Sequence, residues 1–191
     1  MPVTYVNSTS GNTGGWPNKT TSFNIPVPSG YADGDTAWVY IQCGESSFSP
    51  PSSLPGGFTR WDGGAWAYSK DGWTVQIFAY WKPISGSQGS TYNFTFSSTV
   101  AEYYCEILRG ADTVTPLTVA AVVNAPTGGN NVSAGGRTPT LDGSYIGVLL
   151  STWDGVVFNA WGGSTPTMIT RYDGGVGGVF GYHFFYFTAL R

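Results

Sequence analysis

The stretch Thr74-Val75-Gln76-Ile77-Phe78-Ala79-Tyr80-Trp81-Lys82-Pro83 decides the fold class of this chain. Successive side chains of a strand point to opposite faces, so this stretch has one wholly apolar face and one mostly aromatic face. Such a pattern predicts a central strand that is covered on both faces. Proline cannot donate to a ladder, so the strand is expected to end at Pro83.

Further segments of this alternating kind occur along the chain, separated by turns rich in Gly, Pro and Asn. No stretch combines an apolar 3.6-residue period with capping signals, so little or no helix is expected. About ten short strands predict an all-β fold, an antiparallel two-sheet β-sandwich of jelly-roll or Greek-key type. The other expected strands are residues 3–6, 23–27, 36–43, 58–61, 65–68, 92–96, 101–109, 117–123, 145–153, 167–172 and 179–190.

The domain organisation is predicted to be simple. A length of 191 residues suits one β domain with a substantial core, and no linker divides the sequence. We expect a single domain over residues 1–191. Within it, residues 1–18 form an N-terminal strand and loop arm, with the loop at 7–18, and residues 19–191 form the sandwich.

The composition excludes some partners. Net charge is −3 and only eight residues are Lys or Arg, without a cluster, so nucleic acid is not expected as a partner. No apolar run approaches the roughly 20 residues of a membrane span, and no secretory signal is expected at the start. Charged residues make up 10% of the chain, against about 25% in typical soluble domains. Few charges with many aromatic residues suit an all-β protein whose surface is Ser, Thr, Asn and Gly, and this mix is also seen where partners cover much of the surface.

Catalytic and metal-binding residues are not evident. The single histidine, His183, has only Tyr182 and Phe184 as sequence neighbours, whereas a general base needs a positioned partner. One His and two distant Cys do not make a zinc site. Asp-Gly pairs at 33–34, 62–63, 71–72, 142–143, 154–155 and 173–174 lack calcium-loop spacing and are expected to be turns. We therefore expect no enzyme activity, no cofactor and no metal.

Two glutamates share one face of the strand expected at 101–109. Glu102 and Glu106 would lie about 13 Å apart from the rise per residue, beyond the roughly 5–9.5 Å between the carboxyl groups of glycoside hydrolases. We interpret the pair as part of a solvated face.

Four tryptophans, Trp16, Trp61, Trp66 and Trp73, are expected in loops or at strand ends. Sugar-binding modules place stacking aromatic rings at such positions. The alternatives are that these rings close the open ends of the sandwich or form a protein contact, because Trp is common at interfaces. We take these four residues as the candidate partner-binding set, with glycan as one possible ligand.

Several segments, in order along the chain, resemble a β-sandwich family common in phage virion proteins. Phe58 stands where the family usually has Trp, and the aromatic run 184–187 is a departure from the family pattern. The segments that carry the resemblance are Ser22-Phe23-Asn24-Ile25-Pro26-Val27-Pro28-Ser29-Gly30, Gly34-Asp35, Pro55-Gly56-Gly57-Phe58-Thr59, Tyr80-Trp81-Lys82, Leu108-Arg109-Gly110-Ala111-Asp112 with Pro116-Leu117, Thr165-Pro166-Thr167-Met168 and Arg171-Tyr172-Asp173.

The resemblance implies a non-enzymatic virion component, most similar to a capsid decoration (cement) protein. Its expected partner is a major capsid protein, its expected location is the capsid surface after assembly in the host cytoplasm, and a homo-oligomer, as a trimer, suits the three-fold sites of capsid lattices. The alternative is a glycan- or receptor-binding module of a tail or adhesin.

The two cysteines, Cys43 and Cys105, both fall on the apolar side of their expected strands, where free thiols are frequent. We predict that both are reduced. Alkylation of the denatured protein without reductant should add two labels per chain by mass spectrometry. A chain that takes up no label would refute free thiols.

Overall fold

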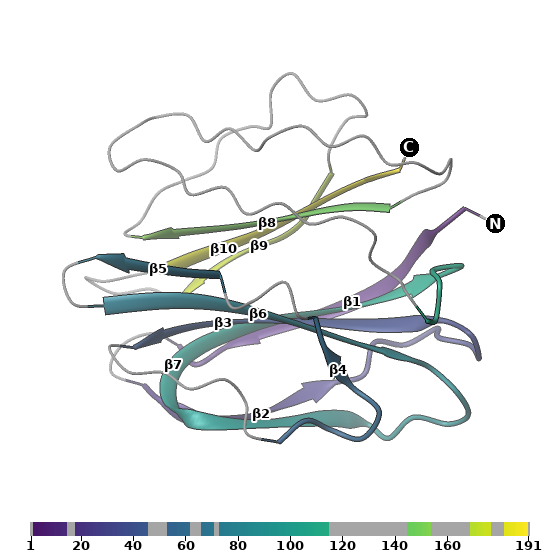
Figure 1. Ribbon diagram of the computed structural model, residues 1–191, viewed down its shortest axis with the longest axis horizontal. Helices are drawn as coiled ribbons and strands as arrows, with labels where there is room; N and C mark the ends of the chain where they lie inside the picture. The colour runs from purple at the N-terminus through teal and green to yellow at the C-terminus, as the bar shows by residue number, and fades with distance from the viewer. Residues whose placement is uncertain are drawn as a thin grey trace.

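The computed structural model in Figure 1 describes residues 2–14, 18–45, 53–61, 66–70, 73–114, 145–153, 169–176 and 182–190. Within these ranges the chain is all-β, without a helix, and every strand pairing is antiparallel. The strands are β1 (Thr4–Asn12), β2 (Thr20–Pro26), β3 (Thr36–Glu45), β4 (Thr59–Arg60), β5 (Trp66–Lys70), β6 (Trp73–Pro83), β7 (Thr91–Arg109), β8 (Tyr145–Trp153), β9 (Ile169–Val176) and β10 (Tyr182–Leu190).

The main sheet has the strand order β1-β7-β3-β6-β4, and β5 also pairs with β6. β6 contains the stretch that opened the sequence analysis and ends at Pro83, as predicted. It has a neighbour on each edge, β3 on one and the short strands β4 and β5 on the other. Phe78 and Tyr80 are buried on one face and Ile77 and Ala79 on the other, so the prediction of a strand covered on both faces is confirmed.

β7 is one strand of 19 residues, where the sequence predicted two. Its first half, from Thr91 to Thr99, pairs with β2, and its second half pairs with β3 and β1. Figure 1 shows β7 bending round between these two roles. Thr99 is buried at the bend, and its Oγ1 donates to the carbonyl of Gly44 at 3.3 Å or to that of Val100 at 3.1 Å.

The first core cluster fills the space between the main sheet and the ribbon formed by β2 and the first half of β7. Side chains from both layers meet edge to face, as where the Phe58 ring centroid lies 4.9 Å from Tyr92 and 5.2 Å from Phe94. The cluster consists of Ile25, Ala37, Val39, Ile41, Cys43, Phe58, Phe78, Tyr80, Ile84, Tyr92, Phe94, Phe96, Ala101, Tyr103, Cys105 and Ile107.

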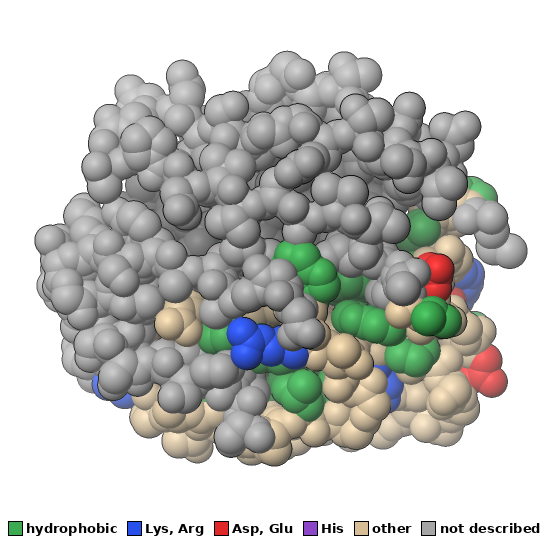
Figure 2. All heavy atoms as spheres, in the orientation of Figure 1, with side chains coloured by type: hydrophobic (Ala, Val, Ile, Leu, Met, Phe, Trp, Pro, Cys, Tyr) green, Lys and Arg blue, Asp and Glu red, His purple; other side chains and the backbone are tan. Residues whose placement is uncertain are grey.

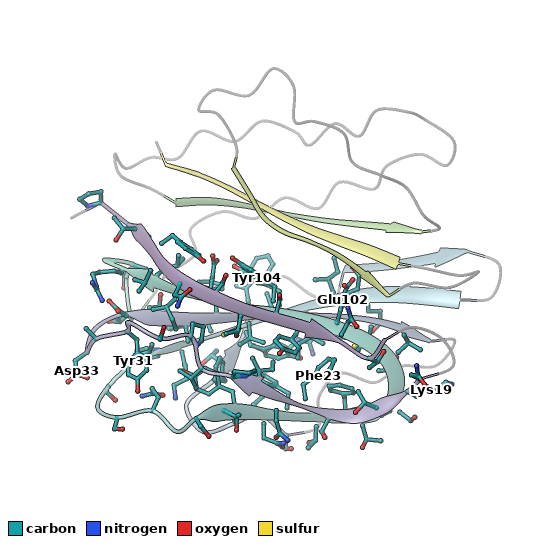
Figure 3. The ribbon with its side chains drawn as sticks, turned by 180° about the vertical axis from the view of Figure 1, so that it is seen from behind. Lys19, Phe23, Tyr31, Asp33, Glu102 and Tyr104 are labelled. Atoms are coloured by element: carbon teal, nitrogen blue, oxygen red, sulfur yellow. The ribbon has the colours of Figure 1, made fainter. Side chains whose placement is uncertain are left out.

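The opposite face of the main sheet carries a second cluster, made of Trp38, Tyr40, Ile77, Ala79, Tyr104 and Leu108. A separate three-stranded sheet of order β8-β10-β9 lies on this side of the molecule (Figures 1 and 3), and its strand β9 contacts β7 and β1. The second face of the main sheet is therefore interior. The two-sheet jelly-roll sandwich of about ten strands stays a prediction, as does the single domain over 1–191.

β1 corrects the prediction for the N-terminal arm. Residues 7–12 were expected to form a loop, yet Asn7 to Asn12 pair with Ile107 to Glu102 of β7. None of the β1 side chains is fully buried. Backbone pairing with β7, not burial of its side chains, therefore makes this segment a strand. The polar sequence alone does not reveal that pairing.

The Asp-Gly pairs behave in two ways. Asp33-Gly34 forms the expected turn, with Gly34 at φ 88°. Asp173-Gly174 does not: both residues lie inside β9, opposite Phe185 and Phe184 of β10. The remaining pairs lie outside the described residues, as does the strand expected at 117–123.

Gly11 allows a close approach that generates a testable prediction. A Cβ at this position would lie 2.8 Å from Cε1 and from the hydroxyl oxygen of Tyr103, whose ring packs on Phe23 at 5.0 Å. Gly11→Ala should therefore displace Tyr103 and lower the free energy of unfolding by about 1–3 kcal/mol, measured by chemical denaturation. Gly56→Ala is the matched control, because a Cβ there meets nothing within 4 Å. Equal stabilities for the two variants would contradict this packing.

Candidate functional site

Three of the four candidate tryptophans lie on β6 or beside it. The backbone N–H of Trp61 donates to the carbonyl of Ala79 at 2.9 Å, and its partly buried side chain packs against the second cluster. Trp66 begins β5, opposite Ile77, and Trp73 begins β6, opposite Lys70. Trp16 lies outside the described residues. The structure thus brings Trp61, Trp66 and Trp73 to one edge of the main sheet.

Figure 2 shows hydrophobic side chains of the described residues on the face seen in Figure 1, with Lys or Arg and acidic side chains among them. Trp81, partly buried, also packs against the second cluster. The partly buried rings of Trp61 and Trp81 at this edge suit a protein or carbohydrate contact.

The prediction of a solvated face for Glu102 and Glu106 is wrong. Both side chains have 0% exposure. The two residues do share one face of β7, as predicted, but β7 lies between β1 and β3 and the three-stranded sheet lies over this side. Figure 3 shows Glu102 and Tyr104 between the main sheet and that three-stranded sheet.

The acid–aromatic face is the name we give to the buried polar and aromatic residues here: Trp38, Tyr40 and Gln42 of β3, and Glu102, Tyr104 and Glu106 of β7. A ladder of stacked rings crosses it, with centroid distances of 6.3 Å for Trp81–Trp38, 6.2 Å for Trp38–Tyr40 and 6.3 Å for Tyr40–Tyr104. The hydroxyl of Tyr40 donates to Oε1 of Glu106 at 3.3 Å. Ring pairs of this kind contribute about 0.5–1.5 kcal/mol each beyond their burial.

Two polar side chains of this face make no hydrogen bond with any described group. They are Gln42, through both its amide oxygen and nitrogen, and Trp38, through its indole nitrogen. Strand register sets Gln42 directly opposite Glu102 and Trp38 directly opposite Glu106. Each buried carboxylate therefore faces a buried polar group across the β3–β7 ladder. As packed, neither carboxylate reaches solvent, so neither can exchange a proton with a dissolved substrate.

A second set of polar groups, from Arg109, Asp35 and Gly30, is hydrogen-bonded together at one end of the main sheet. Nε and Nη2 of Arg109 donate to the two oxygens of Asp35, each at 3.0 Å, and Nη2 also donates to the carbonyl of Gly30 at 3.1 Å. The Asp35 side chain is only 3% exposed, and its Oδ2 also accepts from the N–H of Ala32 at 2.8 Å. Hydrogen bonding to Asp35 raises the pKa of Arg109 above its usual value.

Lys82 lies near this end, on the strand segment next to β4. Its Nζ lies 5.5 Å from the ring centroid of Phe58 and 5.3 Å from that of Tyr92, and it donates to Oε1 of Gln88 at 2.8 Å. Partial burial lowers the pKa of Lys82. The ammonium group of Lys82 thus contacts three other segments, through the rings of Phe58 and Tyr92 and the side-chain amide of Gln88.

The cysteines are free and buried, on the first face as predicted. Cys43 is paired with Ala101 and Cys105 with Val39, so the two lie four positions apart along the ladder and are too distant for a disulfide. Burial raises the pKa of both thiols, with the charge of Glu102 adding to the effect at Cys43 and that of Glu106 at Cys105. Such thiols stay protonated and unreactive.

Other kinds of site find little support in the part of the chain that the structure describes. No three His, Cys, Asp or Glu side chains there are grouped as metal ligands. No helix of the described ranges is long and apolar enough to cross a membrane. His183 lies in β10, opposite Thr152 and Gly175.

Comparisons with known proteins add no relative. No family model matches the chain, and neither a curated protein nor a solved structure is detectably similar to it.

Substitution of Arg109 tests its ion pair with Asp35 at the end of the main sheet. Arg109→Ala should lower the free energy of unfolding, because it leaves the buried carboxylate of Asp35 without its cation. Urea denaturation measures this. Asp35→Asn in the same chain should recover part of the loss, since the uncompensated charge is then gone. Arg60→Ala is the control, and a loss as large as that of Arg109→Ala would contradict a specific role of the pair.

Proposed function

We propose that this protein is a non-enzymatic virion component that binds and stabilises the surface of a phage capsid. In this proposal it is a decoration protein with a jelly-roll-type sandwich fold, its partner is a major capsid protein, and it acts as a homo-oligomer, a trimer at three-fold lattice sites. It would assemble onto the shell in the host cytoplasm.

One observation supports this proposal. Several of the segments that resemble the phage family are far apart in sequence, yet they are hydrogen-bonded to one another at one end of the main sheet. Arg109 of the Leu-Arg-Gly-Ala-Asp segment binds Asp35 of Gly34-Asp35 and the carbonyl of Gly30. Unrelated chance matches would not be expected to converge on one hydrogen-bonded unit.

The other segments join the same unit. Thr59, of the Pro-Gly-Gly-Phe-Thr segment, pairs with Trp81 of the Tyr-Trp-Lys segment, and Lys82 donates to the carbonyl of Gly56 at 3.4 Å. Gly34 and Asp35 exchange backbone hydrogen bonds with Ile84, at 3.0 and 2.8 Å, just after that segment. These residues thus have structural roles that a common fold would require, which supports the resemblance and the virion role that it implies.

The mechanism of a decoration protein is mass action. Binding to the assembled shell, and not to free subunits, lowers the free energy of the shell in proportion to RT ln(1 + [L]/Kd). The tryptophan edge beside β6 is the proposed contact, because loop-borne and edge aromatic rings give large buried areas at low entropic cost. No ionisable group of the acid–aromatic face is accessible for chemistry, which favours binding over catalysis.

The alternative candidate is a glycan- or receptor-binding module. The same tryptophan edge favours it, because pyranose rings stack on Trp. Loss of cell adsorption, instead of loss of shell stability, would then follow from its removal.

Immunogold electron microscopy on particles from the source, with antibody to this protein, tests the location. Label spread evenly over heads is the expected result. Label confined to tail tips would contradict decoration and favour receptor binding, in which case a glycan array is the next measurement. Particles without label would remove the basis for a virion role.

Trp61→Ala tests the contact itself. We expect lower occupancy on heads by cryo-electron microscopy, because the substitution removes the partly buried indole from the proposed edge. Since Trp61 also packs against the second cluster, folding of the variant is checked by circular dichroism. Leu54→Ala is the matched control: Leu54 is also partly buried but packs against the first cluster. Unchanged occupancy with Trp61→Ala would reject this edge as the contact.

A further inference from the structure

The strongest unexplained feature outside the tryptophan edge is the row of residues that contains Gln42. Antiparallel register aligns Gln42 of β3 with Ile77 of β6 on one side and Glu102 of β7 on the other, and Glu102 with Asn12 of β1. Directly opposed residues point to the same face of a sheet. Gln42, Glu102 and Asn12 therefore form a continuous polar row across three neighbouring strands.

Gln42 is the anomaly in this row. It is 1% exposed, and within the described ranges neither its amide oxygen nor its amide nitrogen has a hydrogen-bond partner. More than about 90% of buried polar groups in proteins have a partner, so an amide with both ends unsatisfied points to a missing group. Its position opposite a fully buried carboxylate indicates where that group would lie.

From these observations we propose that the row Gln42–Glu102–Asn12 binds a calcium ion. The donors are all oxygens, one carboxylate and two side-chain amides, which are ligands that Ca²⁺ takes at about 2.3–2.6 Å. The amide oxygen of Asn12 accepts one hydrogen bond, from the N–H of Gly14 at 2.9 Å, and has a second lone pair available. The nearest soft ligand, Cys43, is the next residue along β3 and points to the opposite face, so zinc and other thiophilic metals are disfavoured.

The proposed site is enclosed around Gln42. The two amide atoms of Gln42 have essentially no accessible surface. A water molecule needs hydrogen-bond distances of about 2.7–3.2 Å, whereas a dehydrated calcium ion is held closer. Asn12 is exposed at the outer end of the row. With a single carboxylate the affinity belongs to the weak class, about 0.1–1 mM.

Isothermal titration of the full-length protein with CaCl2 tests the site directly. We expect one calcium ion per chain and, in thermal unfolding, a midpoint about 2–5 °C higher in 10 mM CaCl2 than in EDTA. MgCl2 at the same concentration should give a smaller shift, because Mg²⁺ demands a stricter octahedral geometry and gives up its waters reluctantly. Absence of both the binding heat and the midpoint shift with calcium would overturn the proposal.

Gln42→Leu locates the site. The variant should lose the calcium response, yet be at least as stable as the unsubstituted protein in EDTA, because an apolar side chain removes an unsatisfied buried amide. Gln76→Leu is the matched control, the same substitution on neighbouring β6 at a partly exposed position aligned with Cys43. A calcium response that survives in Gln42→Leu, or disappears in Gln76→Leu, would refute this location.

Glu102→Gln is the second variant, in case Gln42→Leu does not fold. It keeps the shape of the side chain and removes its negative charge, so calcium binding should weaken at least tenfold. Glu106→Gln, which changes the other buried carboxylate of β7, should retain binding. Equal loss in both glutamate variants would contradict a site at Gln42 and Glu102.

Discussion

The structure depends on one strand that belongs to two layers. β7 pairs with β2 through its first half and with β3 and β1 through its second half. The ribbon and the main sheet thus share a backbone, and the register of one fixes the position of the other. Phe94 and Cys105, eleven positions apart on this strand, enter the same core cluster from its two sides. A break at the bend near Thr99 would separate the layers, which explains why a threonine there is fully buried and hydrogen-bonded to backbone.

The same central position explains why two carboxylates are interior. A strand with a neighbour on each edge exposes only its faces, and here both faces of the second half of β7 are covered. Cys105 and Ile107 lie in the first core cluster, and Glu106 is buried beside Trp38 on the other face. Buried charges and amides are costly unless they are paired or bind an ion. Among the described residues, the buried amide of Gln42 is accordingly the group that most needs a partner.

Alternation of side chains was enough to predict the all-β class and the strands β3 and β6, and apolar content was enough for β8. It was not enough for β1, whose polar residues from Asn7 to Asn12 are held by cross-strand bonds to β7 instead of by burial. It also left residues 97–100 of β7 between two predicted strands, where two exposed serines interrupt the apolar alternation. Long-range pairing overrode local preference in both cases.

The candidate site, like the fold, was predicted from sequence only where side-chain type was enough and not where strand pairing was needed. Sequence identified Trp61, Trp66 and Trp73 as residues of interest, but their common position beside β6 follows from pairings that only the fold provides. Sequence also assigned Glu102 and Glu106 to one face, yet could not show that the face is covered. Gln42 gave no signal at all, because its relation to Glu102 comes from the register of two strands about 60 residues apart in sequence.

The pairing of β1 with the end of β7 has a consequence for biosynthesis. Thr4 aligns with Arg109, so β1 waits for a partner made roughly 100 residues later, which takes roughly 5–20 s at ordinary translation rates. During that interval an apolar strand would invite association with other nascent chains. β1 instead carries Asn, Ser, Thr and Gly and no fully buried side chain. Its polar character lets it remain solvated until the sheet that receives it is complete.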